Sequence, residues 1–403
     1  MAITLSAILN RPLGLILGLI DRPMMAVQRR FGTVGMVYIF LLPNLIIFGL
    51  FSFTPALLNI WLSFTGGSSP LISERPFIGL SNYADIFACD SYLQPQTCKV
   101  AGFGFWTSLW NTLVFALIQV PVMTLVALAT ALVLNRRIWG RGFWRAMYFY
   151  PVMLSPVVVS IIWDWILKRR GILNQLLTDS IKWSNKVAEQ PDAMWFVKIG
   201  VLFFLALGAL YLVRFSRWAK IIGGIGLAAV AVWIVAVWDP AATFHIGPWR
   251  PINWLVDRDS VWPTFWVVFV YSWAHLGFYM LILLAGLQAI PRDIYEAATM
   301  DGTSPWRILY RITLPLLMPT LLVVLVLSLI KAFQVFDEVY ILTGGGPGDA
   351  TRFVIQHIYE SAFTGETKLY GIAAAYSVLL AFVIFVLTAM QIFLTRRQAG
   401  GVS

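Results

Sequence analysis

Charged residues are scarce in this chain. Asp, Glu, Lys and Arg together make up 12% of its 403 residues, whereas apolar residues make up 59%. A soluble globule of this composition would lack the polar surface that it needs to cover itself. The composition therefore excludes a soluble globular protein and predicts a chain that lies in a lipid bilayer.

Side chains that hold metals or nucleotides are also rare. The three histidines, His245, His275 and His357, lie far apart in the sequence, and none has a second ligand at the spacing of a metal site. The glycine-rich segment TGGGPGDAT, at 343–351, lacks the Lys followed by Ser or Thr that a phosphate-binding loop requires. We therefore expect no metal site, no bound cofactor and no catalytic residue in this chain, which is not an enzyme in this interpretation.

Only two cysteines are present, Cys89 and Cys98, in the segment CDSYLQPQTC. This segment falls in the first loop on the face that we assign to the outside. A disulfide can form there if that face meets an oxidising periplasm, and two free thiols are the alternative.

Long apolar runs dominate the rest of the chain. A helix that crosses the hydrocarbon core needs about 20 mainly apolar residues. Six stretches meet this requirement clearly and two less clearly. The six are 34–64, 107–134, 143–167, 263–288, 314–336 and 371–394, and the weaker pair is 196–213 and 221–238. The sequence thus predicts an all-α, polytopic membrane helix bundle of about eight spans.

Lys and Arg indicate how this bundle is oriented, because short loops rich in them stay in the cytoplasm. Eight spans put both termini on one side, and the short segments on that side carry most of the Lys and Arg. Five basic residues break the rule: Lys168, Arg169, Arg170, Lys182 and Lys186. We predict that both termini are cytoplasmic. The net charge of +10 follows from this bias and from the anionic inner leaflet, so it predicts no nucleic-acid partner.

The expected division of the chain follows from the spans. Residues 1–33 form an interfacial cytoplasmic segment, 34–395 the transmembrane domain and 396–403 a cytoplasmic tail. Within the transmembrane domain, 175–247 reads as an inserted region that carries the two weaker spans as a hairpin. The segment 289–313 is a polar loop between two of the most apolar spans.

The polar loop contains the signals of a short, rigid helix. Asp293 is a good N-cap and Glu296 can complete a capping box, which predicts a helix that starts at Ile294. Gly302 can adopt the left-handed conformation that ends it. Ala297 and Ala298 leave one face flat, so another backbone can approach closely.

A second helix start follows at once. Ser304 can cap it, and Pro305 suits the first helical position. The orientation puts the short helix in the cytoplasm, between two spans. Such a helix can transmit a displacement from a soluble partner into the membrane.

The loop resembles a known motif. Glu296-Ala297-Ala298, three residues, Gly302, nine residues and then Ile312-Thr313-Leu314-Pro315 resembles the EAA loop of the membrane subunits of binding-protein-dependent ATP-driven importers. Further stretches resemble the carbohydrate-uptake permeases related to the maltose system: 40–64, 77–87, 150–163, 284–291 and 336–351. The resemblance covers the six-span core but not 175–247 or the first thirty residues.

The resemblance implies an assembly. Partners would be a second homologous permease subunit, two ATPase subunits, a periplasmic or lipid-anchored solute-binding protein and membrane lipid, in the bacterial inner membrane. ATP and Mg would be bound by the ATPase subunits. The implied ATPase-coupling residues are Glu296, Ala297, Ala298, Asp301, Gly302, Ile312, Leu314 and Pro315.

Polar groups inside spans are costly, so they are candidates for a substrate pathway. The polar candidates are Asp164, His275, Lys331 and Gln334, and the aromatic ones that could face a sugar are Tyr271, Trp273 and Phe333. Interfacial aromatic belts, snorkelling and helix pairing are the alternative roles for these side chains.

These observations predict a permease subunit that forms half of the pathway for a di- or oligosaccharide or a polyol and works by alternating access. A glycerol phosphate importer is one alternative. An ion-coupled secondary transporter is another, for which Asp164 is the only good relay carboxylate. A scaffold or sensor that recruits a partner through the extra hairpin is a third.

Overall fold

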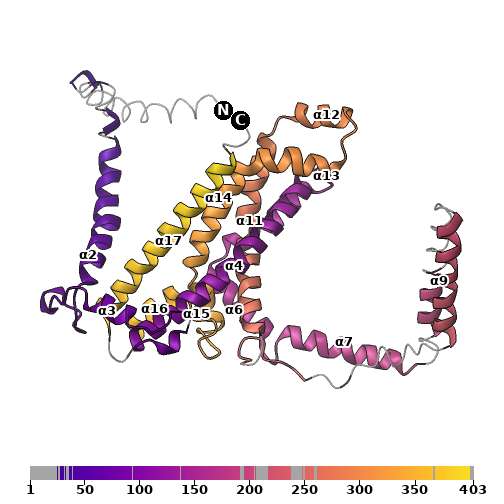
Figure 1. The fold of residues 1–403 in the computed structure, drawn as a ribbon, viewed down its shortest axis with the longest axis horizontal. Coiled ribbons are helices and arrows are strands. Elements are labelled where there is room, and N and C mark those ends of the chain that lie inside the picture. The colour runs from indigo at the N-terminus through magenta and orange to yellow at the C-terminus, as the bar shows by residue number, and fades with distance from the viewer. Residues whose placement is uncertain are drawn as a thin grey trace, which may run out of the picture. The chain divides into compact units, whose positions relative to one another are not determined.

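In the computed structural model of this chain, all elements of regular secondary structure in the described part are helices (Figure 1). That part comprises residues 25, 28–30, 32, 36–38, 40–92, 94–136, 138–190, 195–203, 205, 217–236, 247, 250–257, 261–365 and 368–399. Within it no strand forms, and only two isolated bridges occur, Thr65 with Phe77 and Cys89 with Cys98. The predicted all-α class is confirmed.

Five helices in the described part are long and apolar enough to cross a membrane. They are Met36–Leu62, Val100–Asn135 (α4), Trp262–Ala289 (α11), Pro305–Phe333 and Tyr370–Phe393. The first contains α2 (Thr54–Leu62), the fourth combines α13 (Pro305–Ile308) with α14 (Leu314–Phe333), and the fifth lies in α17 (Tyr370–Ala399). Five of the six clearly predicted spans are therefore present as helices.

The predicted span at 143–167 is not one straight helix. The chain forms α5 (Arg141–Phe149), a 3₁₀ turn (Tyr150–Met153), α6 (Pro156–Leu167) and α7 (Ile172–Ala188), with a bend of 98° after Met153. Ser155 is extended, with ψ 136°, because the residue before a proline is pushed out of the helical region. Counting this bent pair as one span gives six.

The two weaker spans lie partly outside the described residues. Half of 196–213 does, and 221–238 corresponds largely to α9 (Arg217–Ala236). The total of eight spans, the positions of the termini and the peripheral packing of the hairpin therefore stay predictions. The first part of the inserted region, 175–188, belongs to α7, a helix that was not predicted from the sequence.

The chain divides into two compact units. Unit 1 comprises Met1–Phe105 and His357–Phe385, and unit 2 comprises Trp106–Gln356 and Val386–Ser403. In unit 1, the Asn82 amide on α3 (Ser81–Phe87) donates to the carbonyls of Ser63 and Thr65, both at 2.9 Å. A disulfide joins Cys89 and Cys98 in the loop that follows. These bonds hold together the segment after the first span.

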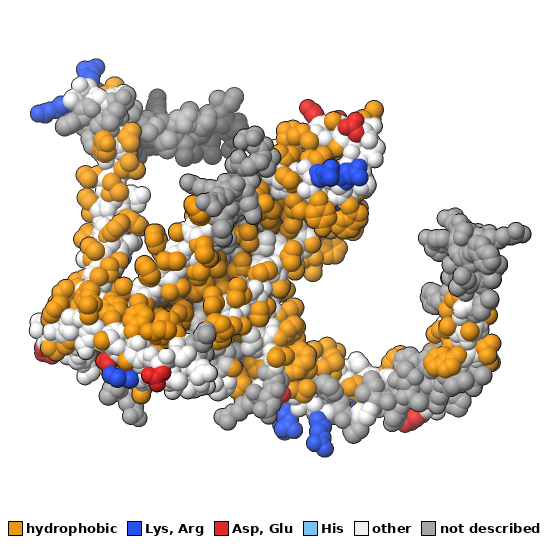
Figure 2. Space-filling view, viewed as in Figure 1, with side chains coloured by type: hydrophobic (Ala, Val, Ile, Leu, Met, Phe, Trp, Pro, Cys, Tyr) orange, Lys and Arg blue, Asp and Glu red, His pale blue; other side chains and the backbone are white. Residues whose placement is uncertain are grey.

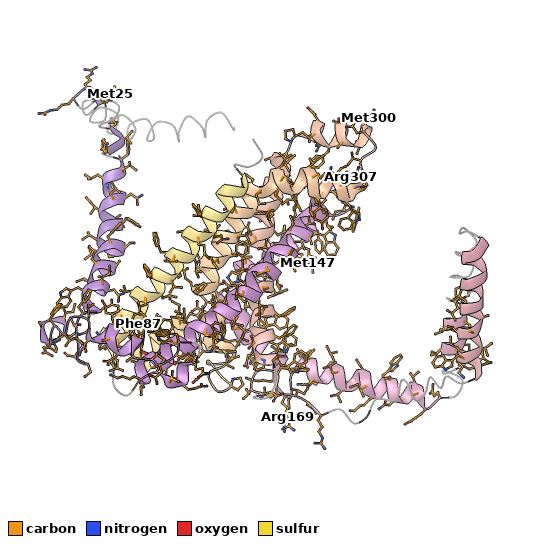
Figure 3. The ribbon with its side chains drawn as sticks, in the orientation of Figure 1. Met25, Phe87, Met147, Arg169, Met300 and Arg307 are labelled. Carbon is orange, nitrogen blue, oxygen red and sulfur yellow. A yellow bond between two sulfur atoms is a disulfide. The ribbon has the colours of Figure 1, made fainter. Side chains whose placement is uncertain are left out.

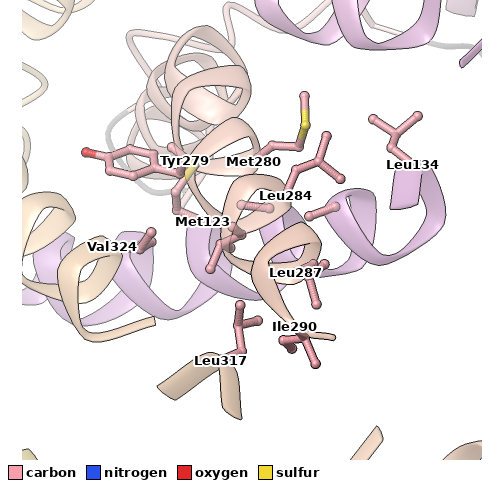
Figure 4. Close-up of a cluster of buried hydrophobic side chains, with 12 residues drawn as sticks. Met123, Leu134, Tyr279, Met280, Leu284, Leu287, Ile290, Leu317 and Val324 are labelled. Atoms are coloured by element: carbon pink, nitrogen blue, oxygen red, sulfur yellow. The ribbon is translucent and has the colours of Figure 1, made fainter. Parts of the chain in front are cut away.

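In unit 2, α4, α11 and α14 pack side by side around one core (Figures 1 and 4). Its buried members are Met123, Ala127, Ala131, Leu134, Tyr279, Met280, Leu283, Leu284, Leu287, Ile290, Leu317 and Val324. Gly286 lets α11 and α14 approach, because a Cβ there would lie 2.6 Å from the Thr320 hydroxyl. Lipid is as apolar as these side chains, so close packing rather than removal from water holds the helices together.

Short helices flank α14 in unit 2. α12 (Arg292–Met300) and α13 precede it, and α15 (Asp337–Leu342) follows it. The π-helical turn Leu309–Thr313 joins α13 to α14. Toward the end of the chain, α16 (Val354–Tyr359) and the π turn Glu360–Thr364 lead to α17.

Candidate functional site

The polar loop of unit 2 carries a short helix, α12, as the sequence predicts, but its start differs. The helix begins at Arg292, with Pro291 in the N-cap position and no side-chain capping bond. The predicted start at Ile294 with Asp293 as N-cap is therefore wrong. Pro291 itself turns the chain out of α11, with φ −58° and ψ 137°, and Asp293 lies inside the first turn. At this position its carboxylate still interacts favourably with the positive end of the helix dipole.

The end of α12 is the predicted one. Gly302 is left-handed, with φ +67°. Its N–H donates to the Thr299 carbonyl at 3.0 Å, and the Thr303 N–H donates to the Ala298 carbonyl at 3.1 Å. These two bonds form a Schellman motif, which satisfies the last carbonyls and fixes the end of the helix.

α13 also starts where the sequence predicts. Ser304 is extended, with ψ 150°, and Pro305 occupies the first helical position. The Ser304 side chain makes no capping bond, so Pro305 and the backbone of Ser304 define this start. The loop is thus a rigid element in which one glycine and one proline separate two helices.

The faces of α12 have different surroundings. Glu296, Ala297 and Asp301 are exposed, whereas Ala298 is only 7% exposed. The Tyr295 hydroxyl donates to the Thr313 hydroxyl at 3.2 Å, and the Tyr295 ring packs on the core. One face is therefore tied to the start of α14, and the other carries acidic groups outward at this end of the unit (Figure 2).

The other residues of the motif lie at the entrance of α14. Ile312 and Leu314 are half-buried, Pro315 is exposed and Thr313 is buried. The Leu314 N–H donates to the Leu309 carbonyl, five residues back, and this wide turn makes room for the Pro315 ring. The π turn Gly49–Phe53 precedes Pro55 in the same way. Met300, at the end of α12, and Arg307, on α13, are exposed side chains of the polar loop (Figure 3).

A second group of polar residues lies beyond the other end of α14. His275 on α11 and Glu338 on α15 face each other, with Nε2 and Oε1 3.8 Å apart. His275 Nδ1 lies 3.0 Å from the Tyr271 carbonyl, and a carbonyl can only accept, so Nδ1 donates. The Tyr271 ring stacks on the imidazole, with centroids 4.3 Å apart.

Glu338 is only 4% exposed. Burial raises the pKa of this carboxyl above its ordinary value. The sequence analysis missed Glu338, because it follows the predicted end of a span and reads as a loop charge. Recognition of α15, in which Glu338 and its neighbour Val339 are both buried, would have identified it.

The remaining pathway candidates have surroundings that differ from those of His275 and Glu338. Asp164 forms an ion pair with Lys168 at 2.6 Å, one turn along the chain. Phe333 is buried, whereas Lys331 and Gln334 are exposed. Trp273 is 38% exposed, and its ring meets that of Trp163 edge to face, with centroids 5.6 Å apart. Of the seven candidates, the structure brings Tyr271 and His275 into direct contact.

No group of three or more His, Cys, Asp or Glu side chains that could hold a metal ion occurs among the described residues. Of the three histidines, His275 and His357 are among those residues, and His245 lies outside them.

Comparison with known proteins gives consistent matches. A family model described as binding-protein-dependent transport system inner membrane component matches residues 100–400. The trehalose/maltose transport system permease protein MalF of Thermococcus litoralis is 29% identical over 343 residues, 85% of this chain and 87% of the relative. The sn-glycerol-3-phosphate transport system permease protein UgpA of Agrobacterium fabrum is 26% identical over 356 residues, 88% of this chain and 92% of the relative.

A solved structure shares the fold. It is the crystal structure of a bacterial alginate ABC transporter in complex with an alginate pentasaccharide-bound periplasmic protein. The TM-score is 0.61 and the identity 19%, over 93% of this chain and 98% of the matched chain.

Proposed function

Because the chain belongs to the family of binding-protein-dependent transport system inner membrane components, we propose that it is a permease subunit of an ATP-driven sugar importer. Members of this family are transport components rather than enzymes. In the proposal the subunit forms half of the translocation pathway. The observation that carries it is α12: a short helix with the complete EAA spacing, closed by a Schellman motif and exposed on one face between two spans.

In this proposal α12 receives force from an ATPase subunit. Glu296, Ala297 and Asp301 form the docking face, because they are exposed. Closure of the ATPase dimer would displace α12 as a rigid body. The Tyr295–Thr313 bond would pass this displacement to the π turn that leads into α14, and the pathway would then open to the other side.

The proposed assembly contains a second permease subunit, two ATPase subunits that bind ATP and Mg, and an external solute-binding protein. The name of the family and the periplasmic protein in the alginate transporter complex support the last of these. The proposed location is the bacterial inner membrane, with α12 on the cytoplasmic side and no cofactor held by this chain.

The proposed substrate is a di- or oligosaccharide or a polyol. The relative from Thermococcus litoralis is named for trehalose and maltose, which supports a sugar. The cluster of Tyr271, His275 and Glu338 places a carboxyl and an imidazole beside an aromatic ring, and these are the kinds of group that bind the hydroxyls and the C–H face of a sugar. Glycerol phosphate is the second candidate, because one relative is named for it.

Reconstitution tests this function. The purified external binding protein is titrated with maltose, trehalose, sorbitol and sn-glycerol-3-phosphate, and uptake of the bound compound is measured in liposomes that contain the whole complex. We expect uptake of a sugar that requires ATP and the binding protein. Uptake by this chain alone, driven by an ion gradient, would contradict the proposal and favour a secondary transporter.

A further inference from the structure

Two adjoining cavities lie at the α12 end of unit 2. The first, of about 680 Å³, runs between the end of α4 and the segment from α12 to the π turn. Most of its lining side chains are apolar, among them Leu132, Val133 and Leu309. Trp306, which is 70% exposed, lies at this cavity. Its size suits a flexible apolar group such as part of an acyl chain.

The second cavity, of about 600 Å³, is basic. Arg136 follows α4, Arg141 begins α5 and Arg292 begins α12, and all three line it. No Asp or Glu is among its lining residues. Within the described residues, no ion pair neutralises any of these three arginines. Three arginines from different parts of the chain thus line one space, an arrangement that suits a phosphate group.

The two cavities share part of their lining. Asn135, Arg136, Leu287 and Tyr295 line both of them. An apolar groove that leads into an arginine-lined space matches an amphiphile with an acyl chain at one end and an anionic group at the other. An acidic protein surface would use the arginines but would leave the apolar groove without a function.

We propose that these cavities bind one anionic phospholipid of the inner leaflet, with its phosphate at Arg136, Arg141 and Arg292 and an acyl chain along Val133. This inference rests on the proposed function only for the assignment of α12 to the cytoplasmic side. Basic pockets at that side of membrane proteins attract anionic headgroups. Because Arg292 belongs to α12, the lipid links the ends of α4 and α5 to the coupling helix and sets its resting position.

Native mass spectrometry of the whole complex from nanodiscs of phosphatidylglycerol and phosphatidylethanolamine tests the site. The variant is R136Q/R141Q/R292Q, and the control is R169Q/R170Q/R250Q, which removes three exposed arginines outside the cavities. Each charge contributes about fivefold to binding, so we expect the variant to retain roughly 100-fold less phosphatidylglycerol and the control to match the unmodified protein. Equal retention by the variant and the control would overturn the proposal.

A second variant keeps all three charges. V133W fills the apolar groove, and we expect it to lower phosphatidylglycerol retention as well, with no change in phosphatidylethanolamine retention. If R136Q/R141Q/R292Q instead loses the ATPase subunits while phosphatidylglycerol retention is unchanged, the arginines bind protein and the lipid proposal is wrong. ATP-dependent uptake is measured on the same samples. Normal uptake with unchanged lipid retention would overturn this inference alone, whereas uptake without ATP would overturn the proposed function alone.

Discussion

The two ends of α14 present their polar groups in opposite ways. At the α12 end, Glu296 and Asp301 are exposed on a helix held by backbone bonds. At the α15 end, Glu338 is buried and faces His275. An exposed acidic face on a rigid helix suits a soluble partner. A buried carboxyl beside an imidazole and an aromatic ring suits a small polar molecule or a tight internal contact.

Reversal of one charge at the α12 end is expected to have the largest effect. Glu296→Lys places a positive charge on the face of α12 that we propose as the ATPase docking face, and loss of a charged contact in an interface costs about 2–5 kcal/mol. We expect ATP-dependent uptake and ATPase stimulation to fall by at least about 30-fold, with an unchanged melting temperature. Glu189→Lys, at an exposed position after α7, is the control. Equal effects of the two substitutions would contradict the proposal that α12 is the docking helix.

The α15 end should affect transport without affecting assembly. Glu338→Gln replaces the carboxyl that faces His275 by an amide, and an unsatisfied buried group costs about 1–3 kcal/mol. We expect uptake to fall by about tenfold, while co-purification of the ATPase subunits stays unchanged. Asp337→Asn changes the exposed neighbour and is expected to be neutral. Loss of the ATPase subunits in Glu338→Gln would mean that the two ends do not have separate roles.

Two adjacent alanines separate docking from packing within α12 itself. Ala298 is buried, so Ala298→Leu overpacks its surroundings and should lower the free energy of unfolding by about 1–3 kcal/mol. Ala297 is exposed, so Ala297→Leu should keep the melting temperature and weaken ATPase binding. Thermal unfolding and ATPase pull-down measure the two effects. The reverse pattern would show that the faces of α12 are assigned the wrong way round.

The smallest expected effect is at the end of α12. An alanine in place of Gly302 must adopt φ +67°, which costs about 1–2 kcal/mol. A Cβ there meets no atom within 4 Å, so the cost comes from the backbone alone. We expect a slightly lower melting temperature and a modest loss of ATPase stimulation. Gly142→Ala, in α5 with equally open space, should not destabilise the protein.

The same comparison explains what the sequence could predict. The structure of the α12 loop could be predicted from local sequence rules, because Gly302 ends one helix and Pro305 starts the next within a few residues. The start at Arg292 did not follow, because Pro291 turns the chain before the expected cap at Asp293 is used. Helix formation in the apolar stretches also depends on local composition, which is why five of the six clearly predicted spans are present as helices.

Features that depend on contacts between distant segments were not predicted. Glu338 becomes a candidate only because α15 folds back against α11 and α6, which no local pattern indicates. The 98° bend after Met153 combines Pro151 and Pro156, each of which alone could have been an ordinary kink. The cavity arginines likewise come from three elements and have no common motif.

Site-specific labelling tests the central claim, that α12 faces the cytoplasm and contacts the ATPase. Cys89 and Cys98 are the only cysteines, so C89S/C98S provides a background for the single cysteine of E296C. A membrane-impermeant maleimide is applied to inverted and right-side-out vesicles, with and without the ATPase subunits. The account predicts labelling only in inverted vesicles and protection by the ATPase. Labelling in right-side-out vesicles, or labelling that the ATPase leaves unchanged, would contradict it.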